Sequence, residues 1–363
     1  MNNAQNAETI ARQFQIPGDL IAATPYGSGH INDTYCVVSD HAGATVRSIV
    51  QRINRNIFKD PVALMENIER VTTHLSAQVS SDPDRDRRVL ALIRSREGHP
   101  FHIDSDDTYW RAYRFIERAK TYDAVESPDQ AFEAARAFGR FQRLLADLPN
   151  PRLHDTIPDF HNTPKRFAAL QQAIAADGAG RAKLAKPEID FALGRGSIVA
   201  VLLNAHLPER VTHNDTKFNN VMLDDDTGEG ICVIDLDTVM PGLALYDFGD
   251  MVRTTTSPTN EDEQDLSKVA MQFPMFEALV RGYLSEAGSF LTKEEKHYLA
   301  FSSKLITFEQ GIRFLTDYLA GDPYYKVHRE GHNLDRCRTQ LKLVESIEAQ
   351  EDRMNRLVHS VEA

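Results

Sequence analysis

Hydrophobic and polar positions are spaced differently in the first and second parts of the chain. Before about residue 118, short runs of strand-like composition alternate with turn residues, and these runs cover 20–24, 34–38, 45–53, 88–95 and 109–116. Runs of this kind, bounded by turns, are typical of antiparallel strands. The pattern therefore predicts a β-rich lobe over residues 1–118.

One helix is predicted within this β-rich part. Asp60 can cap its first turn. Pro61 suits the first helical position, because the N–H of that position has no partner within a helix and proline has no N–H. Apolar residues follow at intervals of four, three and four positions, at Leu64, Ile68, Val71 and Leu75. This spacing places them on one face of a helix.

The remaining residues, 119–363, have the spacing of helices. The longest apolar stripe repeats every three or four positions and stops at Gly321, and its members are Phe301, Leu305, Phe308, Ile312, Leu315 and Leu319. One β-hairpin is predicted in this part, with strands at 221–223 and 231–236. We therefore expect an α+β fold of two lobes, in which a small antiparallel lobe precedes a larger helical lobe with a hairpin.

Composition and charge narrow the class of protein. The 363 residues have a formal net charge of −12, and binding nucleic acid nonspecifically requires basic surface, so we expect no nucleic-acid partner. The longest uninterrupted apolar run, 198–203, is far shorter than the ~20 residues that span a bilayer. The first residues lack the basic start and apolar core of a signal peptide. We expect a cytoplasmic monomer or weak dimer with no membrane partner.

The richest source of candidate chemistry is the segment 211–250. It contains Asp215, then Asn220 five positions later, then the predicted hairpin, and Asp235 at the end of the second hairpin strand. Phosphoryl transfer uses one carboxylate to accept the proton of the attacking hydroxyl, and oxygen ligands to hold the Mg²⁺ ions at the phosphates. A hairpin between Asn220 and Asp235 returns their oxygens to the same end. We therefore predict Asp215 as the catalytic base and Asn220 and Asp235 as metal ligands.

Two further aspartates in this segment compete for the metal role. Asp247 begins a DFG sequence, but it lies 27 residues after Asn220, whereas Asp235 lies 15 residues after it, and only the shorter interval matches one hairpin. We therefore expect Asp247 to be structural. Asp237 lies on the same strand face as Asp235, so it is predicted as a second metal ligand or as a neighbour of one. His213 is expected to fix the backbone.

The sequence HxDxxxxN, followed by ID at the end of a hairpin, resembles the aminoglycoside phosphotransferase-like small-molecule kinases, which are relatives of protein kinases. The longer sequence HNDTKFNNVML, with VIDLDTVMPG and YDFGD after it, is similar to the N-acetylhexosamine 1-kinase branch of that family. The match is dense over about 40 residues and looser over most of the chain. The resemblance implies a bilobal kinase-like fold, and ATP and Mg²⁺ as cofactors.

A glycine loop and a hinge are the predicted nucleotide contacts. Gly27, Ser28 and Gly29 lie between two predicted strands, where exposed backbone N–H groups can bind triphosphate oxygens. The loop is not a Walker P-loop, because no GK[ST] follows it. The base is expected to bond to the backbone of the segment 116–119, where we take Glu117 and Ala119 as its contacts.

Kinases normally place a lysine on the third strand to reach the phosphates, but this chain has no lysine before Lys59. Arg52 is the candidate replacement, because an arginine keeps its charge and can bind phosphate through two N–H groups. Glu66 or Glu69 on the following helix is expected to form an ion pair with it. The alternative is an ordinary surface arginine on an edge strand.

The resemblance also implies where the acceptor binds. Four residues are predicted as contacts of the acceptor: His30, Asn214, Arg313 and Tyr324. An arginine that bonds hydroxyl or amide oxygens, together with an aromatic ring that stacks on a sugar face, suits a neutral polar ligand. The alternative for Arg313 is a surface row of ion pairs with Glu309 and Asp317, which lie four positions before and after it.

The expected activity is transfer of the γ-phosphoryl group of ATP to the anomeric hydroxyl of an N-acetylhexosamine, so the expected partner is a small molecule. The nearest alternative is a kinase of the same fold for an aminoglycoside, a choline-like amine or another sugar. A non-catalytic nucleotide-binding protein and a metal-dependent hydrolase are further candidates. A cationic acceptor would need an acidic pocket, whereas a sugar predicts a neutral pocket that contains Arg313.

Overall fold

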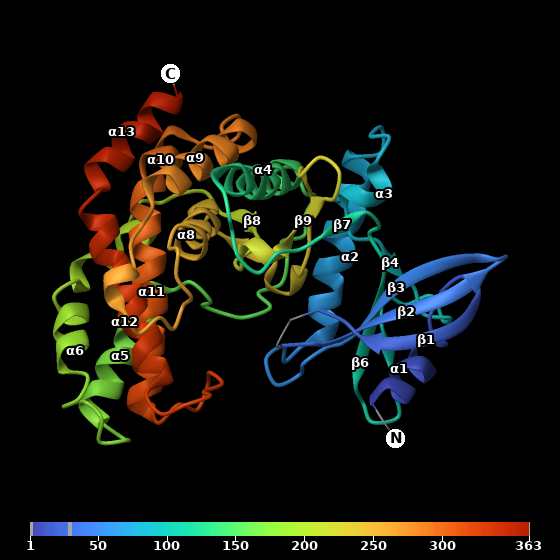
Figure 1. Cartoon of the computed structure of the whole chain (residues 1–363), viewed down its shortest axis with the longest axis horizontal. Coiled ribbons are helices and arrows are strands. Elements are labelled where there is room, and N and C mark those ends of the chain that lie inside the picture. Colours follow the sequence, from blue (N-terminus) through green and yellow to red (C-terminus); the bar gives the residue numbers. More distant parts are fainter. Residues whose placement is uncertain (1–2, 28–30, 363) are drawn as a thin grey trace.

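The computed structural model describes residues 3–27 and 31–362, which form two lobes (Figure 1). The smaller lobe contains a twisted sheet, and the larger lobe is mainly helical. The chain passes between them at the residues that follow strand β6 (Tyr109–Arg114) and precede β7 (Ala119–Lys120). This arrangement confirms the predicted α+β fold with an antiparallel lobe before a helical one.

The sheet of the small lobe is antiparallel. Its strands are ordered β1-β2-β3-β6-β4, with β5 paired to β6, and their bounds are β1 (Asp19–Pro25), β2 (Asp33–His41), β3 (Ala44–Arg52), β4 (Leu92–Ile93) and β5 (His102–Ile103). Helix α1 (Asn3–Ala11) packs on the sheet and buries Ala7 and Ile10 against Val37, Val50 and Trp110. The predicted strand 88–95 is only partly correct, because its first residue ends the charged helix α3 (Arg85–Arg88) and only Leu92 and Ile93 pair with β6.

Helix α2 (Pro61–Gln78) begins as predicted, with the Asp60 side chain accepting a hydrogen bond from the Ala63 N–H at 3.0 Å. Its apolar face joins the main core of the large lobe, where Leu64 and Ile68 share a cluster with Phe138. In Figure 1, α2 lies between the sheet and the helical lobe. The helix therefore precedes the large lobe in sequence but belongs to its core in packing.

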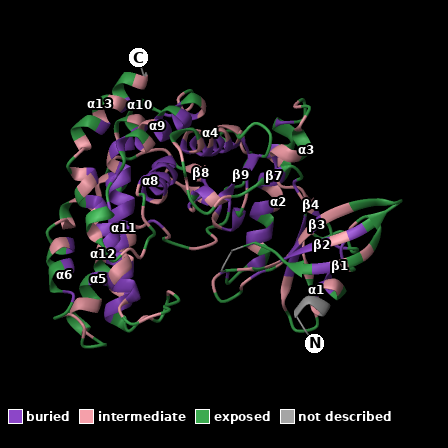
Figure 2. Ribbon diagram, viewed as in Figure 1, coloured by how far each residue is buried: buried purple, intermediate pink, exposed green. Residues whose placement is uncertain are grey.

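The large lobe is a bundle of helices. Their bounds are α4 (Pro128–Leu145), α5 (Thr163–Ala176), α6 (Lys186–Leu193), α7 (Val201–Asn204), α8 (Ala244–Thr255), α9 (Phe273–Ala287), α10 (Lys293–His297), α11 (Leu299–Ala320), α12 (His332–Glu348) and α13 (Glu351–Glu362). Helix α11 carries the predicted apolar stripe and ends at Gly321, which has a left-handed φ of 93°. Figure 2 shows that α8 and α11 are buried along much of their length.

Close contact between α4 and α9 depends on a glycine. A Cβ atom on Gly282 would lie 2.2 Å from the Phe132 carbonyl oxygen, so any side chain there would push the helices apart.

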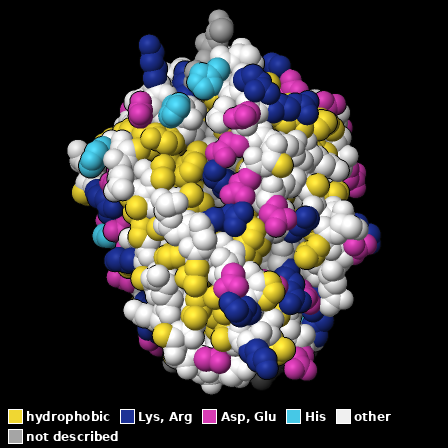
Figure 3. Space-filling model, turned by 90° about the vertical axis from the view of Figure 1, so that its left-hand side faces the viewer, with side chains coloured by type: hydrophobic (Ala, Val, Ile, Leu, Met, Phe, Trp, Pro, Cys, Tyr) yellow, Lys and Arg dark blue, Asp and Glu magenta, His cyan; other side chains and the backbone are white. Residues whose placement is uncertain are grey.

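On the outer face of the helical lobe, positive and negative side chains are interspersed with hydrophobic ones, and this face has no continuous basic patch (Figure 3). None of the helices in the described residues is long and apolar enough to cross a bilayer.

Short strands in the large lobe carry the candidate chemistry. The hairpin β9 (Val221–Asp224) and β10 (Gly230–Val233) pairs with β7, and β8 (Arg210–Thr212) pairs with β11 (Met240–Gly242). The second hairpin strand is shorter than predicted. Asp235 has a left-handed φ of 58°, which turns the chain out of the strand and into a short 3₁₀ turn at Leu236–Thr238.

Candidate active site

The loop after β8 holds Asp215 in contact with two polar neighbours. The Lys217 Nζ atom lies 2.9 Å from Asp215 Oδ1, and the Asn220 amide donates to the Asp215 backbone carbonyl at 2.8 Å. Burial opposes ionisation of Asp215, but the Lys217 ammonium outweighs this effect and lowers the pKa of Asp215 below its ordinary value. The carboxylate is therefore ionised at neutral pH and able to accept a proton.

Lys217 is a site residue that the sequence analysis did not single out. It lies inside the HxDxxxxN segment, two positions after Asp215. The negative charge of the Asp215 carboxylate raises the pKa of Lys217 above its ordinary value, although burial acts in the opposite direction. Its position between Asp215 and Asn220 was the one feature of the sequence that could have indicated a role in the site. The loop thus presents a positive charge beside the predicted base.

Asn220 and Asp235 lie at the same end of the hairpin, as predicted. The Ile234 N–H donates to the Asn220 carbonyl at 2.9 Å, which closes the hairpin immediately before Asp235. Because the Asn220 amide nitrogen bonds to Asp215, the amide oxygen is left for another partner.

The environment of Asp235 is suited to a cation. Its side chain is solvent-exposed, and no hydrogen bond to its carboxylate is found within the described part of the chain. The surrounding protein displaces water that would stabilise the ionised carboxylate, and the Asp237 and Asp215 carboxylates add negative charge. Together these effects raise the pKa of Asp235 to about 6. A carboxylate with acidic neighbours and no donor would be stabilised by a divalent ion. No three His, Cys, Asp or Glu side chains of residues 3–27 and 31–362 form a metal site alone, so a donor set here needs the Asn220 oxygen.

Asp237, the second predicted metal ligand, bonds to side chains of the small lobe. One of its oxygens forms an ion pair with Arg111 on β6, and the other accepts a hydrogen bond from the Asn32 amide at 2.6 Å. Both oxygens are therefore engaged by side chains of the small lobe. Asp237 thus ties the two lobes together beside Asp235, and its role as a metal ligand or as a neighbour of one stays a prediction.

Arg111 is the buried cation that the sequence analysis missed. It is 1 % exposed, and its Nε donates to Gln51 on β3 at 2.9 Å. Burial opposes its charge, but the Asp237 carboxylate outweighs burial, so the pKa of Arg111 is raised above its ordinary value; Asp235 adds to this effect. The signal in the sequence was an arginine inside the strand YWRAYR, where an unpaired charge could not be buried.

The ion pair predicted for Arg52, with Glu66 or Glu69, is wrong. Arg52 is half-exposed and pairs with Asp33 on the neighbouring strand β2. Glu66 and Glu69 each pair with a different basic residue. Arg52 also follows Gln51 in the strand, so it points to the face of the sheet opposite the Arg111 contact. Arg111, not Arg52, is the cation held beside the predicted metal ligands.

The glycine loop is only partly described. Gly27 has a left-handed φ of 80°, which glycine adopts without strain, while Ser28, Gly29 and His30 lie outside the described residues. The loop ends at Asn32, whose oxygen accepts from the Asn54 N–H at 3.0 Å while its amide bonds to Asp237. The far end of the loop is therefore fixed beside the aspartates of the large lobe.

The hinge presents an aromatic surface near the loop. The Glu117 side chain pairs with Arg47, whose guanidinium lies 3.8 Å from the centre of the Phe115 ring. The Tyr26 ring meets the same phenylalanine edge-on at 5.7 Å. These side chains bring β1, β3 and the hinge together on one side of the sheet.

The two predicted hinge contacts, Glu117 and Ala119, both lie against other parts of the protein. The Glu117 carbonyl accepts a hydrogen bond from Arg87 at 2.9 Å, and Ala119 pairs with Asp224 in the β7–β9 ladder. The two predicted contacts stay predictions, and the structure adds a third candidate between them: the Arg118 N–H has no hydrogen-bond partner in the described chain. The backbone of this hinge remains available at that position.

The loop before Asp215 is held from behind. The Asp247 carboxylate, which is completely buried, accepts from the His213 N–H at 2.8 Å and the Asn214 N–H at 2.7 Å. The His213 ring bonds to the Ile234 carbonyl at 2.9 Å. The structural roles predicted for Asp247 and His213 are thus confirmed. The Asn214 amide donates to the Thr238 carbonyl at 2.9 Å, and Asn214 lines a pocket of about 480 Å³ together with Phe160, so its contact with an acceptor stays a prediction.

Arg313 lies against aromatic rings and not in a surface row of ion pairs. Its guanidinium is 5.3 Å from the Phe160 ring centre and 6.0 Å from that of Tyr325, and it donates to Gln310. Tyr324 is 63 % exposed, and its neighbour Tyr325 is the ring that lies near the Arg313 guanidinium. An exposed ring beside the arginine remains available to a ligand, so the predicted acceptor contacts of Arg313 and Tyr324 stay predictions.

The surface-row alternative for Glu309 and Asp317 is wrong. Glu309 is buried, and its carboxylate bonds to His161 at 2.8 Å and to the Thr163 hydroxyl at 2.5 Å. Asp317 accepts backbone N–H bonds from Tyr324 and Tyr325. Both carboxylates thus fix loops around Arg313 and leave its guanidinium without a carboxylate partner at ion-pair distance in the described residues.

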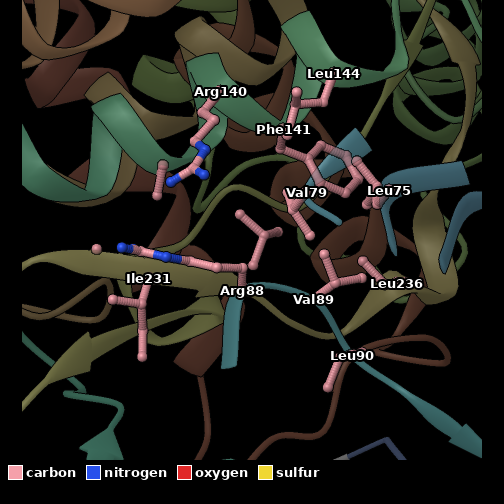
Figure 4. Close-up of a pocket in the computed structure, with 13 residues that line it drawn as sticks. Leu75, Val79, Arg88, Val89, Leu90, Arg140, Phe141, Leu144, Ile231 and Leu236 are labelled. Carbon is pink, nitrogen blue, oxygen red and sulfur yellow. The ribbon is translucent and has the colours of Figure 1, made fainter. Parts of the chain in front are cut away.

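A small pocket lies elsewhere in the protein. Figure 4 shows it between α2, α4 and β10, where Leu75, Val79, Phe141 and Leu236 meet the stems of Arg88 and Arg140. Its free volume of about 30 Å³ holds roughly one water molecule. It contains none of the predicted site residues, and its volume is too small for a nucleotide or a sugar.

Comparison with known proteins agrees with this geometry. Residues 22–279 match the phosphotransferase enzyme family. An aminoglycoside phosphotransferase from Alicyclobacillus acidocaldarius has a similar structure over 97% of this chain and 96% of that one, with a TM-score of 0.65 and 11% identity. A spectinomycin phosphotransferase in complex with ADP and spectinomycin matches over 96% and 98%, with a TM-score of 0.60 and 12% identity.

An aminopropanol kinase associated with a microcompartment also matches, over 97% of this chain and 98% of that one, with a TM-score of 0.56 and 16% identity. At such identities the structural likeness establishes the fold. The family match is broader evidence, because it covers more than half of the chain and includes the loop of Asp215 and the hairpin that follows. The chain therefore belongs to the phosphotransferase enzyme family and is a small-molecule kinase with a protein-kinase-like fold.

Proposed function

We propose that this kinase transfers the γ-phosphoryl group of ATP, with Mg²⁺, to the anomeric hydroxyl of an N-acetylhexosamine. Membership of a phosphotransferase family disfavours the hydrolase and non-catalytic interpretations. The observation that carries the choice of acceptor is the pair of neighbouring guanidinium groups, Arg313 and Arg166, on the predicted acceptor side. The ATP and metal parts rest on the loop of Asp215 and the hairpin beside it.

The acceptor side carries guanidinium groups where a cationic acceptor would need carboxylates. Arg313 and Arg166 are close enough that burial and the Arg313 charge lower the pKa of Arg166. The Arg166 Nε is buried and has no acceptor among the described residues, while its Nη2 bonds to the Phe160 carbonyl at 3.0 Å. An ammonium group would be repelled here, whereas carbonyl and hydroxyl oxygens would accept hydrogen bonds.

This charge distinguishes the chain from relatives of the same fold that act on amines. Aminopropanol, choline and spectinomycin, named for solved relatives, all carry amino or quaternary ammonium groups. An acetamido sugar has no charge, and its acetamide oxygen and ring hydroxyls match the donors of Arg313 and Arg166. The sequence resemblance to N-acetylhexosamine kinases leads to the same substrate class.

In the proposed reaction, Asp215 orients the acceptor hydroxyl and accepts its proton as the oxygen attacks phosphorus. Lys217 stabilises the ionised form of Asp215 and supplies positive charge beside the transferring group. Asn220 and Asp235 would hold Mg²⁺, which when bound neutralises charge on the phosphate oxygens. Arg111 fixes Asp237 and thereby the turn that carries Asp235. Most of the acceleration should come from positioning and electrostatics.

The acceptor is tested by measuring ADP release with N-acetylglucosamine, N-acetylgalactosamine, choline, an aminopropanol and an aminoglycoside, each with and without Mg²⁺. We expect turnover of at least one acetamido sugar, in the presence of Mg²⁺ only, and no turnover of the amines. Turnover of an amine without turnover of either sugar would refute the proposed acceptor. ADP release that is independent of an acceptor would refute transfer itself.

A further inference from the structure

We propose that Arg87 is a positioning residue for the nucleotide, because it clamps the hinge backbone to the hairpin of the metal side. This inference rests on the proposed use of ATP, and it is independent of the identity of the acceptor. Arg87 belongs to the short helix α3, and none of the sequence motifs includes it.

A single guanidinium group joins three segments of the protein. Arg87 Nε donates to the Glu117 carbonyl at 2.9 Å, and Nη2 donates to the Arg118 carbonyl at 2.8 Å. The same Nη2 lies 2.5 Å from the Asp224 carboxylate at the end of β9, and Nη1 bonds to Asp84 at 3.0 Å. The Arg87 side chain is 11% exposed, so these bonds are largely shielded from water.

The hairpin end of this clamp is itself rigid. The Asp224 carboxylate also accepts from the Thr227 N–H at 2.8 Å and from the Asp226 N–H at 3.0 Å. The Asp225 N–H donates back to the Arg118 carbonyl at 3.0 Å. Hydrogen bonds from Arg87 and the turn hold the pKa of Asp224 far below its ordinary value. The two hinge carbonyls therefore bond to a fixed set of donors.

Holding these carbonyls also sets the direction of the hinge N–H groups. In a trans peptide unit the C=O and the N–H point in opposite directions. Because Arg87 holds the Glu117 carbonyl, the Arg118 N–H must point away from Arg87. This N–H has no partner in the described chain, and Arg118 has a left-handed φ of 55°, a conformation that its surroundings must maintain. Arg87 thus presents one unpaired backbone donor to a base.

The clamp also connects the two ends of the nucleotide site. Asp224 ends the strand that begins immediately after Asn220, and the partner strand leads to Asp235. The hinge and the predicted metal ligands are therefore attached to opposite ends of one hairpin, with Arg87 at the hinge end. Loss of Arg87 should loosen the base contact first, while the phosphate end keeps its own contacts through Arg111 and Asn32.

Arg88 offers a matched control on the same helix. It is 13% exposed and pairs with Glu229 on the same hairpin and with Asp82. Figure 4 shows its side chain directed into the core pocket with Arg140, and none of its hydrogen bonds reaches the hinge. Arg88→Ala thus removes an arginine that is buried to a similar extent and bonds to the same hairpin, but it removes no contact to residues 115–119.

The test compares Arg87→Ala, Arg87→Lys and Arg88→Ala by steady-state kinetics and by calorimetric ADP binding. We expect Arg87→Ala to raise KM for ATP and Kd for ADP about tenfold or more, with KM for the acceptor changed by less than about twofold. Arg87→Lys should give an intermediate rise, because an ammonium group cannot hold both carbonyls as a planar fork does. Arg88→Ala should leave Kd for ADP within about twofold, even where it lowers Tm.

Equal effects of Arg87→Ala and Arg88→Ala on ADP binding would overturn the proposal, as would an unchanged Kd in the Arg87 variants. If Arg87→Ala does not fold, Arg87→Lys carries the same test. If the unmodified protein binds no ADP, the proposed use of ATP fails and this inference fails with it. If it binds ADP but phosphorylates a different acceptor, only the acceptor proposal fails.

Discussion

At the residue scale, the chemistry depends on neighbours that set the charge of each carboxylate. Asp215 and Asp235 are both aspartates of the same site, yet their pKa values move in opposite directions. Lys217 holds Asp215 in its ionised form, whereas the protein and the adjacent carboxylates raise the pKa of Asp235. One carboxylate is thus prepared to accept a proton, and the other to bind a cation.

Asp215→Asn removes the proposed base and keeps the shape of its side chain. We expect kcat to fall by about 10²–10⁴-fold, because general base catalysis contributes an effect of this size. Asp226→Asn, at an exposed turn of the hairpin, is the control and should keep full activity. The measurements are initial rates of ADP release and thermal unfolding, and a variant that keeps more than about a tenth of kcat would remove Asp215 from this role.

Arg313→Met tests the acceptor side at one residue. The variant keeps an apolar stem against Phe160 but loses the donors, so we expect KM for the acetamido sugar to rise about tenfold while KM for ATP stays constant. Arg336→Met, which removes another guanidinium stacked on an aromatic ring, is the control. A parallel rise of both KM values would indicate general damage and contradict a specific contact.

At the element scale, the hairpin β9–β10 unites the site. It places Asn220 and Asp235 at one end and bonds to the hinge at the other, and its pairing with β7 extends the contact between lobes. Asp224 is the residue on which its turn depends, because its carboxylate bonds both to the turn N–H groups and to Arg87. Stability of this element should therefore depend on the ionisation of one side chain.

The pH dependence of stability should report on Asp224. Its folded-state pKa is lowered, so the unfolded chain takes up the proton first as pH falls. The contribution is complete above about pH 5 and is lost as pH falls below about 4, towards the folded-state pKa. Asp224→Asn should cost about 1.5–3 kcal/mol at about pH 7, and the difference from the unmodified protein should shrink by about pH 3. Urea unfolding across this range measures it, and a difference that grows on acidification would be contrary to the assignment.

At the scale of the whole molecule, the lobes are joined by a buried ion pair as well as by the chain. Arg111 and Asp237 come from different lobes, and both are nearly inaccessible to water. Asn32 adds a neutral hydrogen bond at the end of the glycine loop. The position of the small lobe over Asp235 is therefore set by pairs of side chains that lie 126 and 205 residues apart in sequence, and not by the hinge alone.

Removing one partner of this pair should be worse than removing both. Asp237→Asn leaves a buried guanidinium without its counter-charge, and we expect a loss of about 3–5 kcal/mol of stability. Adding Arg111→Met should restore part of it, because the unpaired charge is then gone. Urea unfolding of the two single variants and the double variant tests this, and losses that simply add would refute the coupling.

The parts of this molecule that could be predicted from sequence are those encoded by nearby residues. The spacing from Asp215 to Asn220 and Asp235 spans one loop and one hairpin, so local geometry is enough to predict that these three residues lie near one another. Arg111 was missed because its partner is 126 residues away, and a strand pattern shows a buried charge without showing what pairs with it. The backbone bonds from Tyr324 and Tyr325 to Asp317, which orient that loop, are likewise not shown by a sequence pattern.

Packing between lobes was also beyond the sequence pattern. The apolar face of α2 was correctly predicted, yet periodicity alone does not tell which core a helix joins, and α2 packs on α4 in the large lobe. The same limit applies to Arg52, whose predicted glutamate partners lie on that helix and bond elsewhere.

The central claim is that this site phosphorylates the anomeric oxygen of a neutral acetamido sugar. Phosphorus NMR of a mixture of the protein, ATP, Mg²⁺ and N-acetylglucosamine or N-acetylgalactosamine tests it most directly. We expect a new phosphomonoester signal coupled to the anomeric proton, formed together with ADP and absent without Mg²⁺. Phosphate attached at another hydroxyl, or inorganic phosphate as the only product, would contradict the claim.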